Sequence, residues 1–269
     1  MRKALTYLTV TDLIFILLLS LSGFFGGVLN RIVYYLAFII PFAVTIFIKS
    51  KTSAKFSPLG IKISGKNFAL VIPTVAPTLA LVFLISWLTS LLLSFIGQGS
   101  ITDVSGNIFA VIIFHAVLPA ILEEALFRYV PIAFISPYTK RGAVFISAIF
   151  FGLIHCNLYQ MPYAFFAGAV FALLDIAFDS ILPSVILHFL NNLVSVFWLR
   201  GGANQIFATA YIIVIISLAL LSMIAILLLY KRYKERFLPI FWDKRKYKLP
   251  YEPILLIVLT LFIAVTNLN

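Results

Sequence analysis

The feature that most constrains this chain is a series of apolar runs, each close to the length that crosses a lipid bilayer. A membrane-spanning helix needs about 20 consecutive apolar residues. The runs cover roughly residues 12–29, 32–48, 68–96, 108–136, 142–158, 162–179, 181–199, 205–230 and 254–268. A water-soluble core could not bury this much hydrocarbon, since 63% of the residues are hydrophobic and 11% are charged. The sequence therefore predicts an all-α integral membrane protein, a bundle of about eight transmembrane helices, or nine if the last run also crosses.

No polar linker divides the chain, so residues 1–269 are expected to form a single polytopic membrane domain. Two runs are short, with about 17 residues in 142–158 and about 15 in 254–268. A re-entrant or interfacial segment fits each of them as well as a full crossing does. The single cysteine, Cys156, excludes an intramolecular disulfide and a cysteine-based metal cluster.

The basic residues predict the orientation in the membrane, because short cytoplasmic loops carry an excess of Lys and Arg. A cytoplasmic N-terminus puts 17 of the 20 basic residues inside, in the segments 2–3, 49–66, 140–141 and 231–248. The net charge of +11 is thus explained by topology and by contact with anionic lipid headgroups. A nucleic acid partner is not needed. The composition fits a multi-pass protein of a prokaryotic cell membrane.

The run 108–136 contains three ionisable side chains near its centre, namely Glu123, Glu124 and Arg128. Each charge at a helix centre costs about 2.5 to 3.5 kcal/mol, so these groups must face protein or water. Glu124 and Arg128 are four residues apart with the acid first, which predicts an ion pair. Glu123 points about 100° away from Glu124 and is left without a partner. An unpaired carboxylate inside a membrane indicates a functional site.

Two other runs carry polar side chains that could meet this carboxylate. Phe151 and His155 are four residues apart in one run, and His188 and Asn192 are four apart in another, so each pair shares a helix face. An imidazole and a carboxylate that converge in a partly dry cavity are suited to general acid and base catalysis. The pattern favours a site in an intramembrane cavity.

The three motifs, in this order on successive membrane helices, resemble those of the CPBP family of CAAX prenyl endopeptidases and bacteriocin-processing enzymes. They read EExxxR at 123–128, FxxxH at 151–155 and HxxxN at 188–192. The resemblance covers about residues 115–200, and the motif-bearing protease core spans about 108–200. It implies an intramembrane endopeptidase.

Carried over by position, the resemblance implies that Glu123 and His155 activate a water molecule for direct attack on the scissile carbonyl, with Glu123 as the general base. His188 and Asn192 match positions that stabilise the oxyanion, a role that requires hydrogen-bond donors. The other motif positions would support the site through their ion pair. The candidate catalytic residues are Glu123, Glu124, Arg128, His155, His188 and Asn192.

Catalysis without a cofactor is the preferred prediction, with zinc as the alternative. Glu123, His155 and His188 would be the zinc ligands, because zinc binds nitrogen and oxygen donors of these types. No HExxH motif is present, and Asn192 is a better hydrogen-bond donor than zinc ligand.

The predicted substrate is a peptide or a lipidated peptide. Within the family, a CAAX prenyl endopeptidase proper and an enzyme that processes leader or bacteriocin peptides both stay open, and a prokaryotic protein favours the second. The rival class is non-enzymatic, either a transporter that uses Glu123 as a proton carrier or an immunity-type scaffold.

Four further residues carry secondary expectations. His115 lies outside the motifs and is expected to line the cavity or to have a structural role. Asp175 and Asp179 are expected to form a solvated or interfacial pair. Pro119, four residues before Glu123, is expected to kink its helix and help to open the cavity.

Overall fold

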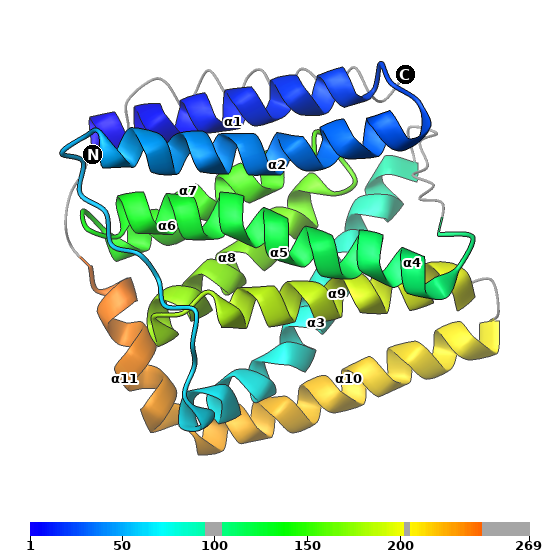
Figure 1. The fold of residues 1–269 in the computed structure, drawn as a ribbon. Coiled ribbons are helices and arrows are strands. Elements are labelled where there is room, and N and C mark those ends of the chain that lie inside the picture. Colours follow the sequence, from blue (N-terminus) through cyan, green and yellow to red (C-terminus); the bar gives the residue numbers. More distant parts are fainter. Residues whose placement is uncertain (95–103, 202–204, 244–269) are drawn as a thin grey trace.

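The structure is a computed structural model that describes residues 1–94, 104–201 and 205–243. These residues form a bundle of helices whose connections are mostly short (Figure 1). The helices are α1 (Arg2–Ser22), α2 (Gly27–Ser50), α3 (Gly65–Ser94), α4 (Ile108–Ile112), η1 (Ile113–Val117), α5 (Leu118–Glu124), η2 (Ala125–Tyr129), α6 (Val130–Ile135), α7 (Lys140–Leu153), α8 (Met161–Phe178), α9 (Leu182–Gly201), α10 (Gln205–Leu228) and α11 (Tyr230–Phe241). The predicted all-α membrane fold is confirmed.

Seven of the described helices are long and apolar enough to cross a bilayer: Lys3–Ser22, Gly27–Ser50, Gly65–Ser94, Ile108–Ile135, Met161–Phe178, Leu182–Gly201 and Thr209–Leu228. The predicted run 142–158 corresponds to α7, which has 14 residues. It is therefore about 21 Å long, less than the roughly 30 Å of a hydrocarbon core. The predicted run 254–268 lies outside the described residues.

The predicted start of the first span at residue 12 is wrong. α1 begins at Arg2, so Asp12 lies in the middle of the helix. The Asp12 side chain is buried in the bundle, which lets a charged residue sit within the span without facing lipid.

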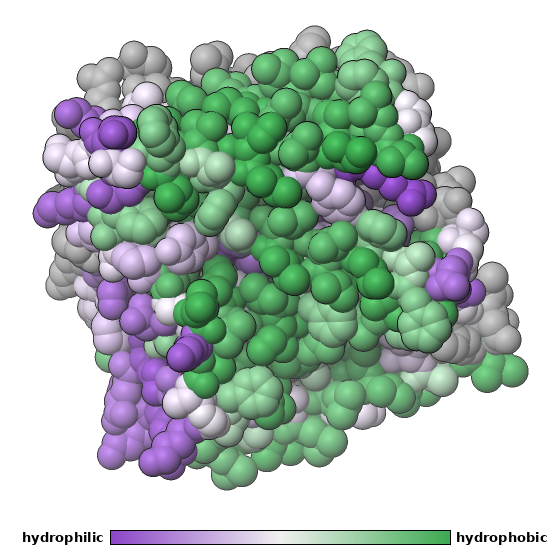
Figure 2. Space-filling model, in the orientation of Figure 1, coloured by the Kyte–Doolittle hydropathy of each residue, from purple (hydrophilic) through white to green (hydrophobic). Residues whose placement is uncertain are grey.

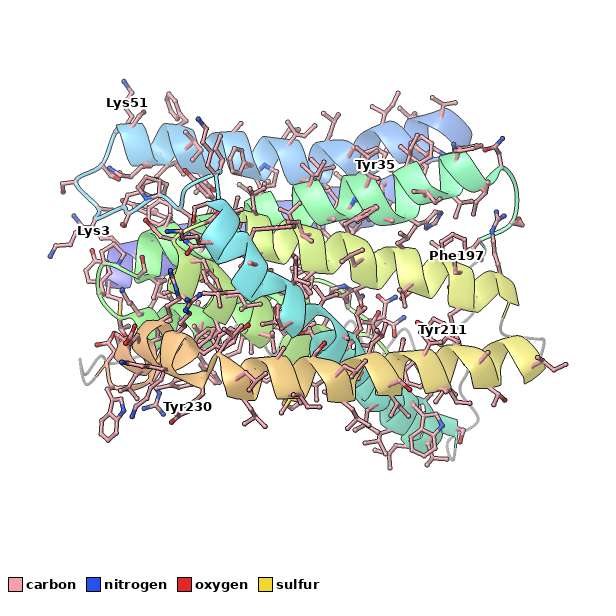
Figure 3. The ribbon with its side chains drawn as sticks, turned by 90° about the horizontal axis from the view of Figure 1, so that it is seen from below. Lys3, Tyr35, Lys51, Phe197, Tyr211 and Tyr230 are labelled. Atoms are coloured by element: carbon pink, nitrogen blue, oxygen red, sulfur yellow. The ribbon has the colours of Figure 1, made fainter. Side chains whose placement is uncertain are left out.

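Basic side chains gather at one end of the bundle. Lys3, Lys51 and Tyr230 of the basic helix α11 lie at this end in Figure 3. The segment between α2 and α3 is bonded there, since Gly60 pairs with Ser180 in a single β-bridge. Figure 2 shows the same end as a hydrophilic edge beside a broad apolar face. The surface thus has the pattern of a membrane protein with one strongly basic end.

The segment 108–135 is a continuous helix that contains two π-helical stretches, η1 and η2. Each stretch contains a residue whose backbone carbonyl lacks its usual helical hydrogen bond. The residue four positions later is a proline, which has no N–H to donate. Pro131 leaves the Phe127 carbonyl free, and the Ser147 hydroxyl donates to it at 2.9 Å. In the same way, Pro119 cannot donate a hydrogen bond to the carbonyl of His115. The irregular turns flank α5 and so surround the two glutamates.

α7 and α8 form a hairpin that starts and ends at the basic end. The backbone N–H of Lys140, at the start of α7, donates to Asp243 at 2.6 Å. At the end of α8, Arg236 of α11 donates to the Ala177 carbonyl at 3.3 Å. The turn between the two helices carries His155 and points into the bundle. The short α7 thereby places a histidine within the span instead of at a membrane surface.

Candidate active site

Glu124 is held by partners from two helices. Its side chain has no exposed surface. Oε2 lies 3.4 Å from Nε of Arg128, so the predicted ion pair is present. Nδ1 of His188, on α9, donates to Oε1 at 2.7 Å. A buried carboxylate is tolerated when it is paired in this way, and Glu124 thereby fixes the position of the His188 ring.

Arg128 is also fully buried, and it packs among aromatic rings. Its guanidinium carbon lies 3.8 Å from the centroid of Phe151 on α7 and 5.8 Å from that of Phe171 on α8. Nη1 donates to the Phe127 carbonyl at 3.1 Å. The cation–π contacts join α7 and α8 to the helix that carries both glutamates.

Gly168 provides the space for this guanidinium. A Cβ atom at this position would lie 3.0 Å from Nη2 of Arg128 and 3.3 Å from the Cα of Ala148. A side chain here would therefore press on both the buried cation and the backbone of α7. The glycine belongs to the structural support of the site, and no motif in the sequence identified it.

Asp175 corrects a prediction. It was expected to form a solvated or interfacial pair with Asp179, but its side chain is fully buried, whereas Asp179 is exposed. Oδ1 of Asp175 accepts a hydrogen bond from the Ser184 backbone N–H at 3.0 Å, which ties the end of α8 to the start of α9. The carboxylate is part of the buried polar group that includes Glu124 and Arg128. Its spacing from Asp179 gave no sign of this, because the burial is decided by α9.

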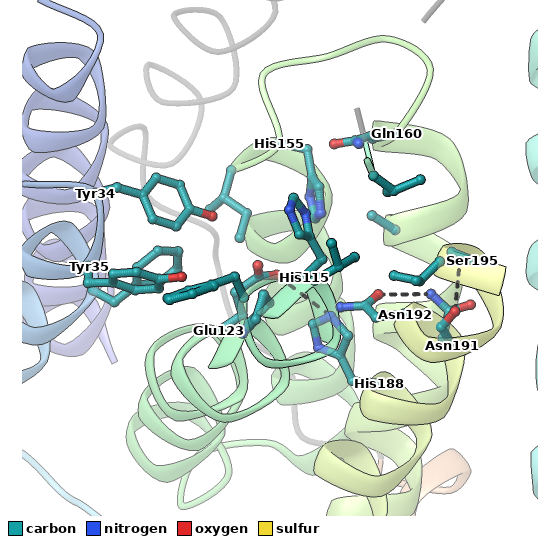
Figure 4. A pocket seen from close by; sticks show the side chains of 18 of the residues that line it. Tyr34, Tyr35, His115, Glu123, His155, Gln160, His188, Asn191, Asn192 and Ser195 are labelled. Carbon is teal, nitrogen blue, oxygen red and sulfur yellow. Dashed lines mark hydrogen bonds and ion pairs between the residues drawn. The ribbon is translucent and has the colours of Figure 1, made fainter. Parts of the chain in front are cut away.

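Glu123 faces a different environment from Glu124, at the floor of a cavity of about 920 Å³. Its side chain is 12% exposed, and Oε2 has no hydrogen-bond partner among the described residues. This atom lies 3.8 Å from Nε2 of His188. The two neighbouring glutamates therefore contact opposite nitrogens of one imidazole. Of the two, Glu123 is the one that lines the cavity (Figure 4).

The pairing of Glu123 with a histidine differs from the expectation. The family resemblance implies that Glu123 and His155 activate a water molecule together, with His188 in the oxyanion role. In the structure the imidazole within 4 Å of Glu123 is that of His188, and His155 lines the same cavity. Packing between α5 and α9 decides this, and spacing along the chain does not reveal it.

His155 lies in the turn after α7, and its ring points into the cavity (Figure 4). Its Nδ1 is 2.8 Å from the Phe151 carbonyl oxygen. A carbonyl can only accept, so Nδ1 carries the proton and Nε2 of the neutral ring has a free lone pair. The FxxxH spacing thus orients the imidazole through the backbone of its own helix.

Asn192 lines the cavity one helical turn beyond His188. Nδ2 of Asn191 donates to Oδ1 of Asn192 at 3.3 Å, which orients the Asn192 amide and leaves its own N–H groups as donors (Figure 4). A carbonyl bound between Glu123 and Asn192 would meet an acceptor on one side and a donor on the other. That is the polarity an acyl-transfer site requires.

Other polar side chains complete the cavity wall. His115 lines it, in agreement with the expected cavity-lining role, and Pro119 also faces it. Tyr34 of α2 and Tyr163 of α8 line it as well. No signal in the sequence indicated these two tyrosines, because tyrosines are frequent in this chain and neither belongs to a motif.

Within residues 1–94, 104–201 and 205–243, no group of three or more His, Cys, Asp or Glu side chains is arranged to hold a metal ion. Glu123, His155 and His188 all line the cavity, but they do not form such a group. Catalysis without a metal stays a prediction.

Comparison with known proteins addresses the same segment. Residues 105–194 match the family model described as Type II CAAX prenyl endopeptidase Rce1-like. No curated protein and no solved structure matches the chain. The match contains all three motifs, so the resemblance to the CPBP family is confirmed over this segment. It is a family of membrane proteases.

Proposed function

Because residues 105–194 form a CPBP-family segment, we propose that this chain is a glutamate-dependent intramembrane endopeptidase. One observation carries the proposal. Glu123 lies at the floor of a large cavity, and its free carboxylate oxygen is 3.8 Å from Nε2 of His188. Burying a carboxylate inside a membrane without a compensating partner costs free energy. General-base catalysis is a function that requires such a carboxylate.

In this proposal Glu123 and His188 bind the attacking water together. The 3.8 Å separation is too long for a direct hydrogen bond. A water molecule that bridges the two atoms would lie about 2.8 Å from each of them. Glu123 removes one proton as the water oxygen attacks the scissile carbonyl. It then gives this proton to the leaving amine as the C–N bond breaks, so no covalent intermediate is formed.

Asn192 and His155 complete the proposed reaction site. The oriented N–H groups of Asn192 would stabilise the oxyanion of the tetrahedral intermediate, a contribution of about 10²- to 10³-fold in rate for one donor. The free Nε2 lone pair of His155 would accept a hydrogen bond from the water or the leaving group. Phe151 supports this role by holding the opposite nitrogen.

Glu124, Arg128 and Asp175 act as positioning residues in the proposal. Glu124 holds Nδ1 of His188 and so aims Nε2 at Glu123. Arg128 neutralises Glu124 and leaves Glu123 as the carboxylate that faces the substrate. Two carboxylates of different environment, one paired and one free, are a common arrangement in acid and base catalysis.

The test is cleavage of peptides by purified protein in proteoliposomes, read as release of fluorescence from quenched random-sequence peptides. We expect Glu123→Gln to lower the rate by about 10²- to 10⁴-fold, the usual contribution of a general base. Glu235→Gln is the matched control, because Glu235 is an exposed carboxylate on α11. Both variants should reach normal abundance in the membrane. Undiminished cleavage by Glu123→Gln would refute the proposal.

The same assay decides the role of metal. Without zinc in the mechanism, incubation with a strong chelator should leave the rate unchanged. A loss of cleavage that added zinc restores would instead support zinc at Glu123, His155 and His188.

A further inference from the structure

Exposed residues of the cavity wall gather toward one end of the bundle. Apart from its floor, the cavity is lined by residues at the start of α2 (Asn30 and Arg31), the start of α4 (Asn107) and the last turns of α9 (Ser195 and Leu199). In Figure 1 the start of α4 and the end of α9 lie together, at the end opposite α11. We call this group of ends the mouth.

The floor is closed toward the other end. A layer of side chains without exposed surface lies there and does not line the cavity; it contains Ala133, Ile135, Asp175, Ser180 and Ser184. The segment between α2 and α3 covers this layer. The Ser57 N–H donates to the Ala133 carbonyl at 2.8 Å, and the Ile181 N–H donates to that of Gly60 at 2.9 Å. A peptide can therefore reach Glu123 through the mouth and not through the closed end.

The closed end is also the basic end. The lysine-bearing segment 49–66, the turn at 140–141 and the basic helix α11 all lie there, as does the start of α1 (Figures 1 and 3). The positive-inside rule assigns such an end to the cytoplasm. The mouth then opens at the opposite, extracytoplasmic face of the membrane.

We propose that the site receives its substrates from the extracytoplasmic face, and that they are exported or externally presented peptides instead of prenylated cytosolic proteins. The direction of access rests on the cavity and the charge distribution alone. The substrate class rests in addition on the proposed peptidase function. This inference separates the two alternatives that the sequence left open.

The shape of the cavity limits what the substrate can be. His188 lies six residues after the start of α9 and eleven residues before Leu199 at the mouth. At 1.5 Å per helical residue, the mouth is about 16 Å from the floor. An extended chain covers this distance with about five residues. The substrate must therefore present an unfolded segment of this length, as a leader or a short secreted peptide does.

The mouth also has a chemical preference. Among its lining residues Arg31 is exposed and charged, and Asn30 and Asn107 are polar. The guanidinium carbon of Arg31 lies 5.6 Å from the centroid of the Phe114 ring, and Tyr34 also lines the cavity. A peptide with a carboxylate beside an apolar side chain is complementary to this cation and its aromatic neighbours, whereas a polybasic peptide would meet Arg31 unfavourably.

The direction of access can be tested by cysteine labelling of the full-length protein in intact cells. Cys156→Ser removes the single cysteine, and Ser105→Cys then places a thiol at the mouth. Lys62→Cys, at an exposed position of the basic end, is the matched control. With a membrane-impermeant maleimide we expect Ser105→Cys to be labelled in intact cells and Lys62→Cys only after permeabilisation. The reverse pattern would overturn the inference.

The substrate class can be tested with oriented membrane vesicles. Quenched random-sequence peptides with an impermeant tag should be cleaved by right-side-out vesicles, and cleavage should fall at least tenfold in inverted vesicles. Faster cleavage by inverted vesicles would overturn the proposed substrate class. Absence of cleavage in both preparations would overturn the peptidase function and the substrate class together, while the labelling result would still decide the orientation of the mouth.

Discussion

Removing the charge of Arg128 should strongly destabilise the fold, and the size of the effect follows from its contacts. The guanidinium is fully buried and 3.4 Å from Glu124. At an effective dielectric constant of about 20, the Coulomb attraction at this distance is about 5 kcal/mol. In Arg128→Met the Glu124 carboxylate would keep its hydrogen bond from His188 but would lose its cation. An uncompensated charge within the span costs about 2.5 to 3.5 kcal/mol.

We therefore expect Arg128→Met to lower the free energy of unfolding by about 3 kcal/mol, within the range for breaking a buried pair. The double variant Glu124→Gln/Arg128→Met removes both charges and should recover at least half of this loss, because replacing a complete buried pair is often close to neutral. The two single variants and the double variant form a double-mutant cycle. The difference between the double variant's change in free energy and the sum of the two single changes gives the coupling between the two positions.

The assay is equilibrium unfolding of the purified protein in mixed micelles with increasing denaturing detergent. Lys62→Met is the matched control, since it removes an exposed basic side chain and should change stability by less than about 0.5 kcal/mol. If Arg128→Met lost less than about 1 kcal/mol, or if the double variant were as unstable as the single one, Glu124 would not be held by this ion pair.

Two further predictions concern the support of the site and its mouth. Gly168→Ala should lower the free energy of unfolding by about 1 to 3 kcal/mol through overpacking against Arg128, whereas Gly65→Ala, with no atom within 4 Å of the added Cβ, should have little effect in the same assay. Arg200→Met removes the hydrogen bonds at 2.9 and 2.7 Å that hold the backbone of residues 104–106 at the mouth, so KM should rise several-fold while kcat is unchanged. A change in kcat alone would contradict the second prediction.

Features that depend on local sequence could be predicted. Hydropathy identified the membrane class and most spans, because the bilayer requires a long apolar segment wherever a helix crosses. The Glu124–Arg128 ion pair followed from a four-residue spacing on one helix. The motifs predicted a resemblance to a protease family, and the match of residues 105–194 to the Rce1-like family model confirmed it over this segment.

Two predictions were wrong because each was made from one segment, without the helices that pack against it. The apolar run beginning at residue 12 missed the first turns of α1, since Asp12 is buried against other helices. Asp175 was expected to be solvated, but Ser184 of α9 binds and covers it. In both cases packing against another helix buries an acidic residue that the local sequence placed at or near the end of an apolar run.

The sequence by itself determined which groups could carry out the chemistry, because a carboxylate or an imidazole within a membrane span has few other uses. Tertiary structure alone decided which histidine lies beside Glu123, since that contact joins helices 65 residues apart along the chain. It also brought exposed cavity-lining residues of α2, of the start of α4 and of α9 to the end of the bundle away from α11. Contacts between helices depend on how the helices pack, and the spacing of residues within one segment does not determine that packing.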